Sequence, residues 1–150
     1  MCQHVDMTET VGPVAQSVGY VLKQVASRLR AAMDEVLRPL DLTVSQYVCL
    51  ELLKQQPGMS NADLARAAFV TRQSMNLVLR GLQDRGLLSR PEVAETGRAL
   101  PTELTPAGGR ALAAASAAVR GVEKRMLGPL SGPEQQRLLG DLTRCAQALV

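Results

Sequence analysis

The chain of 150 residues is poor in aromatic side chains: it has no tryptophan, one phenylalanine and two tyrosines. Its hydrophobic fraction is nevertheless 46%, so a folded core has to be built mainly from leucine, valine, alanine and methionine. This hydrophobic content argues against a disordered chain. Because leucine and alanine are strong helix formers, the composition favours a mainly helical domain.

Histidine and cysteine are also scarce. The chain has one histidine, His4, and three cysteines, Cys2, Cys49 and Cys145, at wide and irregular spacing. This spacing fits neither a disulfide framework nor a zinc site, so we expect no metal and no cofactor. We also expect no enzyme, because a cysteine nucleophile would need a general base and the single histidine lies in a polar N-terminal stretch.

Long hydrophobic runs are missing as well. No apolar run approaches the ~20 residues that span a bilayer, and the polar, acidic N-terminus is unlike a secretory signal. We therefore expect a cytoplasmic protein without membrane contact. The net charge is +3, and 14 of the 17 basic residues are arginines. Arginine side chains suit phosphates and guanine edges, but genomic base composition also raises the frequency of arginine. The charge of the chain is therefore compatible with nucleic-acid binding but does not by itself indicate it.

The periodicity of apolar residues predicts six helices. Steps of three and four over residues 14–40 indicate a helix of about seven turns that ends at Pro39. Capping residues then mark the starts of the later helices. Their expected positions are residues 44–55 after Thr43, a short helix after Ser60, a helix from Thr71 to about Arg85, a helix from Pro106 to about Met126, and a last helix after Ser131.

Between the fourth and fifth helices the period changes to that of short strands. Residues 87–93 and 99–105 are strand candidates, and polar residues 94–98 form the turn between them. Pro91 and Pro101 restrict both strands to sheet edges. A hairpin that follows a helix pair is a wing, so the expected fold is mainly α with a small β-hairpin wing (α+β), a winged helix-turn-helix.

The terminal helices carry more apolar surface than one small core can cover, which favours a homodimer. We expect residues 1–13 to form a flexible tail. Residues 14–40 and 106–150 are predicted to form a helical dimerisation domain, and residues 41–105 a winged helix-turn-helix DNA-binding domain. A two-fold dimer of this kind would bind double-stranded DNA at a pseudo-palindromic site.

The helix from Thr71 is the expected recognition helix of the major groove. One face is apolar and carries Met75, Val78, Leu79 and Leu82. The other face carries arginine, glutamine and asparagine, which pair bidentately with guanine or adenine, and it has no acidic residue before Asp84. Arg98, beside the hairpin tip, is placed to meet a minor groove or a phosphate. The predicted DNA-contacting residues are Ser60, Asn61, Thr71, Arg72, Gln73, Ser74, Asn76, Arg80 and Arg98.

Three stretches of the sequence resemble the MarR family of bacterial regulators: LTVSQYVCLELL, SNADLARAAFVTRQSMNLVLRGLQDRGLLSRP and GRALPTELTPAGGRAL. The phrase LxxxGLLxR at residues 82–90 and the LTPAG at residues 104–108 are typical of that family. The family usually has an aspartate two residues before the wing arginine, where this chain has Thr96. The resemblance implies a homodimeric, ligand-responsive repressor.

The resemblance also implies an effector, often a small aromatic or phenolic molecule, bound between the dimerisation and DNA-binding regions. Candidate residues are Arg30, Met33, Tyr47 and Arg110. For Met33 and Tyr47 packing in the core is the favoured interpretation, and for the two arginines a role as surface charges is favoured.

Two alternatives remain open. The first is a redox-responsive regulator of the same fold, which needs an exposed cysteine of low pKa. Cys49 has the surroundings of a core residue, Cys145 lies on the apolar seam expected at a dimer interface, and Cys2 has no visible activator. The second is a winged-helix module that binds protein and not DNA, which would leave the polar face of the recognition helix without a purpose.

Overall fold

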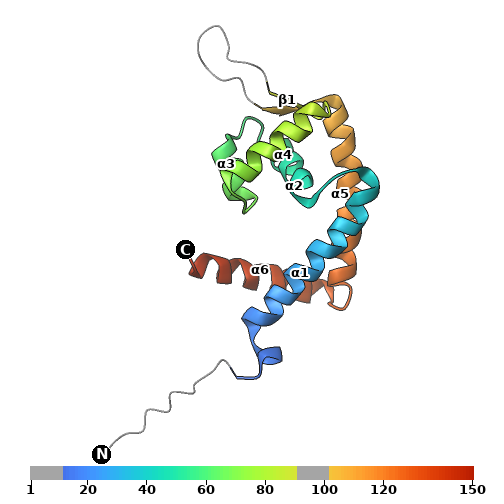
Figure 1. The fold of residues 1–150 in the computed structure, drawn as a ribbon. Helices are drawn as coiled ribbons and strands as arrows, with labels where there is room; N and C mark the ends of the chain where they lie inside the picture. Colours follow the sequence, from blue (N-terminus) through green and yellow to red (C-terminus); the bar gives the residue numbers. More distant parts are fainter. Residues whose placement is uncertain (1–11, 91–101) are drawn as a thin grey trace, which may run out of the picture.

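The computed structural model describes residues 12–90 and 102–150, and in these residues it shows a mainly helical fold with a two-stranded antiparallel sheet (Figure 1). The expected fold class, a winged helix-turn-helix, is therefore confirmed. The elements in chain order are η1 (Val14–Gln16), α1 (Val18–Leu37), η2 (Arg38–Leu40), α2 (Val44–Gln55), α3 (Asn61–Ala67), α4 (Arg72–Asp84), β1 (Leu88–Ser89), β2 (Glu103–Leu104), α5 (Pro106–Leu127) and α6 (Gly132–Ala148).

The prediction of one continuous helix over residues 14–40 is wrong at both ends. Ser17 is extended, with φ −77° and ψ 123°, and separates the 3-10 turn η1 from α1. The apolar pattern missed this break because Val14 and Val18 keep a helical spacing across it. At the other end Pro39 has no N–H to donate, so the chain tightens into the 3-10 turn η2 after Leu37.

The predicted starts of the five later helices are confirmed by their caps. Thr43 and Ser131 form capping boxes: in the first, the Gln46 amide N–H donates to Thr43 Oγ1 at 3.1 Å, and the Thr43 amide donates to Gln46 Oε1 at 3.0 Å. Ser60, Thr71 and Thr105 cap α3, α4 and α5 through their side-chain oxygens. Each cap satisfies amides that a helix leaves without an internal partner.

The hydrophobic core lies in the lobe formed by α2, α3 and α4. Its largest fully buried side chains are Leu37, Leu50, Leu53, Leu64, Met75, Leu79 and Leu82. The end of α1 and the first half of α5, with Leu112 and Ala115, close this core. Beyond it α1 and α5 run side by side, and the C-terminal end of α6 projects beyond them (Figure 1). Helix α6 lines a groove with the start of α1 and the end of α5 and buries none of its residues.

The base of the wing is tied to the start of α5. Leu88 pairs with Leu104 and Ser89 with Glu103 across the antiparallel sheet. The Thr105 hydroxyl donates to the Gly86 carbonyl at 2.6 Å and accepts from the Gly108 amide at 3.1 Å. These bonds explain the LTPAG phrase: its threonine links the cap of α5 to the end of α4.

Two segments of the prediction lie outside the described residues. Residues 1–11 include most of the expected tail, and residues 91–101 include the expected turn and the outer halves of both strand candidates. Within the described residues the strands are shorter than predicted: β1 ends at Ser89 and β2 begins at Glu103, while Leu87, Arg90, Thr102 and Thr105 lie outside them. Within residues 12–90 and 102–150, no helix has the length and apolar character that crossing a membrane requires.

Candidate nucleic-acid interface

Helices α3 and α4 form the helix-turn-helix, joined by a tight turn through Ala68, Phe69 and Val70 (Figure 1). Phe69 has φ 58°, in the left-handed region, and its side chain is 93% exposed. Met75, Leu79 and Leu82 of α4 pack in the core and are almost fully buried.

The opposite face of α4 is open to solvent. Arg72, Gln73, Asn76 and Arg80 are all exposed, as predicted from the sequence pattern. Arginine and glutamine present donors and acceptors that match the major-groove edges of guanine and adenine. The described fold thus leaves the side chains of Arg72, Gln73 and Arg80 open to solvent, as a helix that reads a DNA groove requires.

The start of α4 offers donors for phosphate. Thr71 Oγ1 accepts from the Ser74 amide at 3.0 Å and donates to Ser74 Oγ at 3.0 Å. The Ser74 hydroxyl keeps its own hydrogen for an outside acceptor. The first amides of a helix have no internal partner and, with the helix dipole, favour an anion at that end.

Asn61 and Asn76 are brought together by the fold. Asn61 Nδ2, at the start of α3, donates a hydrogen bond to Asn76 Oδ1 on α4. Asn61 Oδ1 is buried and has no hydrogen-bond partner among the described residues. Both residues were predicted to contact DNA, but in this structure the side-chain amide of Asn61 is hydrogen-bonded to that of Asn76. One of the two acceptor positions of the oxygen with which Asn76 would read adenine is therefore already engaged.

The acidic residue of α3 is neutralised within its own helix. Asp63 pairs with Arg66 one turn later. Hydrogen bonding from Ser60 is the main cause that lowers the Asp63 pKa, and the positive charge of Arg66 lowers it further. Since α4 has no acidic residue before Asp84, neither α3 nor α4 brings an unpaired carboxylate to the first two turns of α4.

Sequence reasoning missed Leu77. It lies on the polar face of α4, four residues after Gln73 and three before Arg80, and it is 66% exposed. The signal was present in the sequence as an apolar residue on the wrong side of an amphipathic helix. Arg98, in contrast, lies outside the described residues, and its contact with DNA stays a prediction.

The four residues predicted to line an effector pocket do not share one environment. Met33 and Tyr47 are partly buried against the core, whereas Arg30 and Arg110 are exposed. Burial raises the pKa of Tyr47, although a hydrogen bond with Ser116 of α5 opposes the shift. A pocket formed by these four residues stays a prediction.

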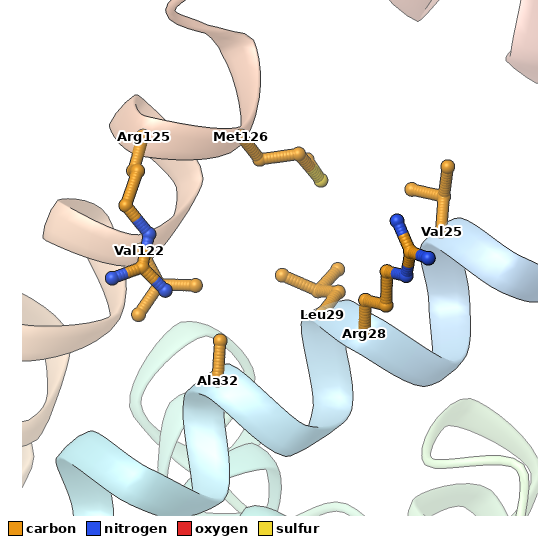
Figure 2. Close-up of a pocket in the computed structure, with 7 residues that line it drawn as sticks. All are labelled: Val25, Arg28, Leu29, Ala32, Val122, Arg125 and Met126. Carbon is orange, nitrogen blue, oxygen red and sulfur yellow. The ribbon is translucent and has the colours of Figure 1, made fainter.

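A cavity of about 250 Å³ lies between α1 and α5, at a different place. Figure 2 shows Leu29 and Met126 pointing toward each other across it, with the guanidinium groups of Arg28 and Arg125 to either side. The lining residues are Val25, Arg28, Leu29, Ala32, Val122, Arg125 and Met126. An apolar floor between two cations suits a small molecule with one ring and one negative charge.

The two cysteines in the described residues differ in environment. Cys49 is fully buried, as predicted, and burial raises its thiol pKa to about 12. Such a thiol stays protonated and unreactive. Cys145 on α6 is exposed in the single chain, and its burial at a dimer interface stays a prediction. Cys2 lies outside the described residues.

Comparison with known proteins places this chain among transcriptional regulators. Residues 42–100 match the model of the MarR family. The HTH-type transcriptional repressor Rv2887 of Mycobacterium tuberculosis is 48% identical over 120 residues, which cover 79% of this chain and 86% of that protein.

Solved structures of the same mycobacterial protein superpose on this fold. Its complex with salicylic acid has a TM-score of 0.74 and 42% identity, and covers 86% of this chain and 96% of that one. Its complex with DNA has a TM-score of 0.73 and 40% identity, and covers 86% of this chain and 97% of that one.

Proposed function

This chain belongs to the MarR family of transcriptional regulators, and on that premise we propose that it is a repressor that binds duplex DNA as a homodimer and releases it when a small aromatic acid binds. It is a regulator and not an enzyme. The observation that carries the proposal is the outward polar face of α4, anchored by a buried aliphatic row. The repressor of M. tuberculosis, solved with DNA, supports it.

We assign the DNA contacts by the geometry of each side chain. Arg72, Gln73 and Arg80 are exposed on α4 and would contact base edges. Ser60, Thr71 and Ser74 stand at helix starts and would contact phosphates. Asn61 and Asn76, which bind each other, would set the orientation of α4 against α3. Arg98 would contact the minor groove or a phosphate beside it.

DNA binding is tested by fluorescence anisotropy with a duplex enriched from a random-sequence pool by the wild-type protein. Arg80→Ala or Gln73→Ala should weaken specific binding by about 1–3 kcal/mol and relax the preference at one base position. Arg137→Ala, at an exposed arginine of α6, is the control and should bind normally. Wild-type affinity should fall steeply with salt, because phosphate contacts release counterions. Unchanged affinity and base preference in both α4 variants would contradict the assignment.

The homodimer is supported by an apolar surface that the single chain leaves open. A groove of about 440 Å³ runs between the start of α1, the end of α5 and α6. Its large apolar side chains include Val18, Val21, Leu22, Val25, Met126, Leu138 and Leu142. Several of these are well exposed, among them Leu22 at 48% and Leu142 at 42%. Clustered exposed apolar side chains of this kind support association with a second copy of the chain.

Analytical ultracentrifugation tests the dimer. Leu22→Glu and Leu142→Glu should each shift the protein towards monomer, because a carboxylate would be buried without a partner at the interface. Lys23→Glu is the control, next to Leu22 on an exposed position of α1. A wild type that sediments as a monomer at micromolar concentration would contradict the proposal. In the dimer two α4 helices would lie about 34 Å apart and read half-sites one helical turn apart.

The cavity between α1 and α5 is the proposed effector site. Ligand pockets usually enclose about 300–1,000 Å³, so a cavity of about 250 Å³ suits a single-ring molecule. Arg28 and Arg125 would neutralise its carboxylate, while Leu29, Val122 and Met126 would contact the ring. The mycobacterial repressor, solved with salicylic acid, supports this ligand class.

Isothermal titration with salicylate tests the site. Arg28→Gln and Arg125→Gln should each weaken salicylate binding at least fivefold and should leave operator affinity without ligand unchanged. Arg30→Gln is the matched control, two residues from Arg28 on α1 and outside the cavity. If only Arg30→Gln or Arg110→Gln weakened binding, the effector would lie in the crevice predicted from the sequence.

A further inference from the structure

The middle of the DNA-facing side of α4 is occupied by an apolar residue. Gln73, Leu77 and Arg80 follow one another at helical spacing and form the outer row of α4. This row points away from Met75, Leu79 and Leu82, which are buried. Leu77 is 66% exposed, so the described fold makes little use of its side chain for packing.

An exposed leucine by itself needs no explanation, because much of any protein surface is apolar. The position of Leu77 is what sets it apart. It stands between two side chains assigned to base contacts, in the first half of a helix whose N-terminal part faces base edges. Neighbours in such a row are about 5–6 Å apart, so the three side chains meet different base pairs.

Asn76 does not fill this central position. Its Oδ1 accepts the hydrogen bond of Asn61 and draws the side chain towards α3. A polar base edge opposite Leu77 would therefore lose its water without gaining a hydrogen bond, which costs free energy. The thymine 5-methyl group is the apolar feature of the major groove, and apolar side chains recognise it by contact.

We propose that Leu77 is a specificity-determining residue that reads the 5-methyl group of one thymine in each half-site, between the bases contacted by Gln73 and Arg80. This inference rests on the proposed DNA binding. It assigns the central contact of α4 to apolar recognition, and it predicts that each half-site contains a thymine at a fixed position.

The experiment removes the methyl group from the DNA and the leucine from the protein, separately and together. A duplex enriched from a random pool by the wild type is synthesised with each thymine replaced in turn by uracil, which lacks only the methyl group. Affinities are measured for the wild type, Leu77→Ala and Leu77→Met. The thermal transition of each variant is recorded, and it should not change because Leu77 is exposed.

At one thymine of each half-site, uracil should weaken wild-type binding about three- to fivefold, the value of one buried methyl contact. Leu77→Ala should weaken binding to the thymine duplex by a similar factor and show no thymine–uracil difference at that position. Leu77→Met, which keeps an apolar side chain, should retain the difference.

A wild type that binds DNA but tolerates uracil at every position would overturn the inference and leave the proposed function standing. A thymine–uracil difference that persists in Leu77→Ala would also overturn it, because another side chain would then read the methyl group. A wild type without sequence-specific DNA binding would overturn both.

Discussion

Asn61 Nδ2 donates a hydrogen bond to Asn76 Oδ1 and so joins the first turn of α3 to the middle of α4. The carbonyl oxygen of Asn61 is buried without a hydrogen-bond partner among the described residues. The pair therefore stabilises the helix-turn-helix through one hydrogen bond between side-chain amides. It also leaves one buried acceptor, Asn61 Oδ1, without a hydrogen bond from the described residues. This arrangement has consequences for stability and for base recognition.

For stability, Asn76→Ala should lower the free energy of unfolding by about 1–2 kcal/mol, because the partly buried Asn61 amide loses its acceptor. Asn61→Ala should lower the free energy of unfolding by a smaller amount, since it also removes the buried oxygen that has no hydrogen bond. The double variant should resemble Asn61→Ala alone. Urea denaturation of the three variants measures this coupling, and strictly additive losses would show that the two residues act independently.

For base recognition, the Asn76→Asp variant distinguishes two roles of Asn76: orienting α4 against α3, and contacting a base in the major groove. An aspartate still accepts the hydrogen bond of Asn61, but it cannot donate to adenine. If Asn76 positions α4, the base preference at every operator position should stay as in the wild type, although the added negative charge weakens overall affinity. If Asn76 reads a base, the preference at one position should move from adenine to cytosine. Selection of binding sites with both proteins decides between the two.

Gly108 is required by the close approach of α5 to the chain after α4. A Cβ at this position would lie 2.0 Å from the backbone carbonyl oxygen of Leu87. Gly108→Ala should therefore destabilise the protein by roughly 2 kcal/mol or more, measured by chemical denaturation, because backbone has to move. Gly109→Ala is the neighbouring control: its Cβ meets nothing within 4 Å, and it should be neutral or stabilising by about 0.5–1 kcal/mol. Equal effects would refute the role given to Gly108.

Phe69 is a residue whose replacement should stabilise the fold. It holds φ 58° with a side chain that is 93% exposed, and the left-handed conformation costs a non-glycine residue about 1–2 kcal/mol. Phe69→Gly should raise the free energy of unfolding by about 0.5–1 kcal/mol after the greater chain entropy of glycine is subtracted. Ala67→Gly, in α3, should instead lower it. Loss of stability in Phe69→Gly would mean that the ring makes contacts that the single chain does not contain.

Cys49 should behave as a buried, protonated thiol. Its pKa is raised from 9.0 to about 12 by burial, so the folded state holds the proton more tightly than the unfolded chain. The stabilisation is complete below pH 9 and is lost as the pH rises towards 12. The free energy of unfolding should thus fall more steeply between pH 9 and 11 in the wild type than in Cys49→Ala. Parallel slopes would contradict this account.

The same property bears on redox sensing. Iodoacetamide at pH 8 should modify Cys49 at least about a hundredfold more slowly in the folded protein than in urea, because thiolate is the reactive form and is nearly absent. Peptide mapping by mass spectrometry measures the rate. Rapid modification of Cys49 in the folded state would revive the alternative of a redox-responsive regulator acting through this residue.

The sequence by itself determined the order of the helices, most of their starts and the two faces of α4. These features follow from interactions over short stretches of chain: a cap such as Thr71 contacts an amide three residues later, and the apolar period of α4 depends only on helix geometry. Local order of this kind is readable from residue types alone.

Only the tertiary structure decided which polar groups are free to act. Asn61 and Asn76 are 15 residues apart and meet because α3 packs on α4. Gly108 approaches Leu87 because α5 starts against the wing base, and Arg28 and Arg125 share a cavity because α1 and α5 lie side by side. The sequence pattern marks each of these residues as polar, small or charged, but their partners are set by the packing of separate helices, which periodicity along one helix does not encode.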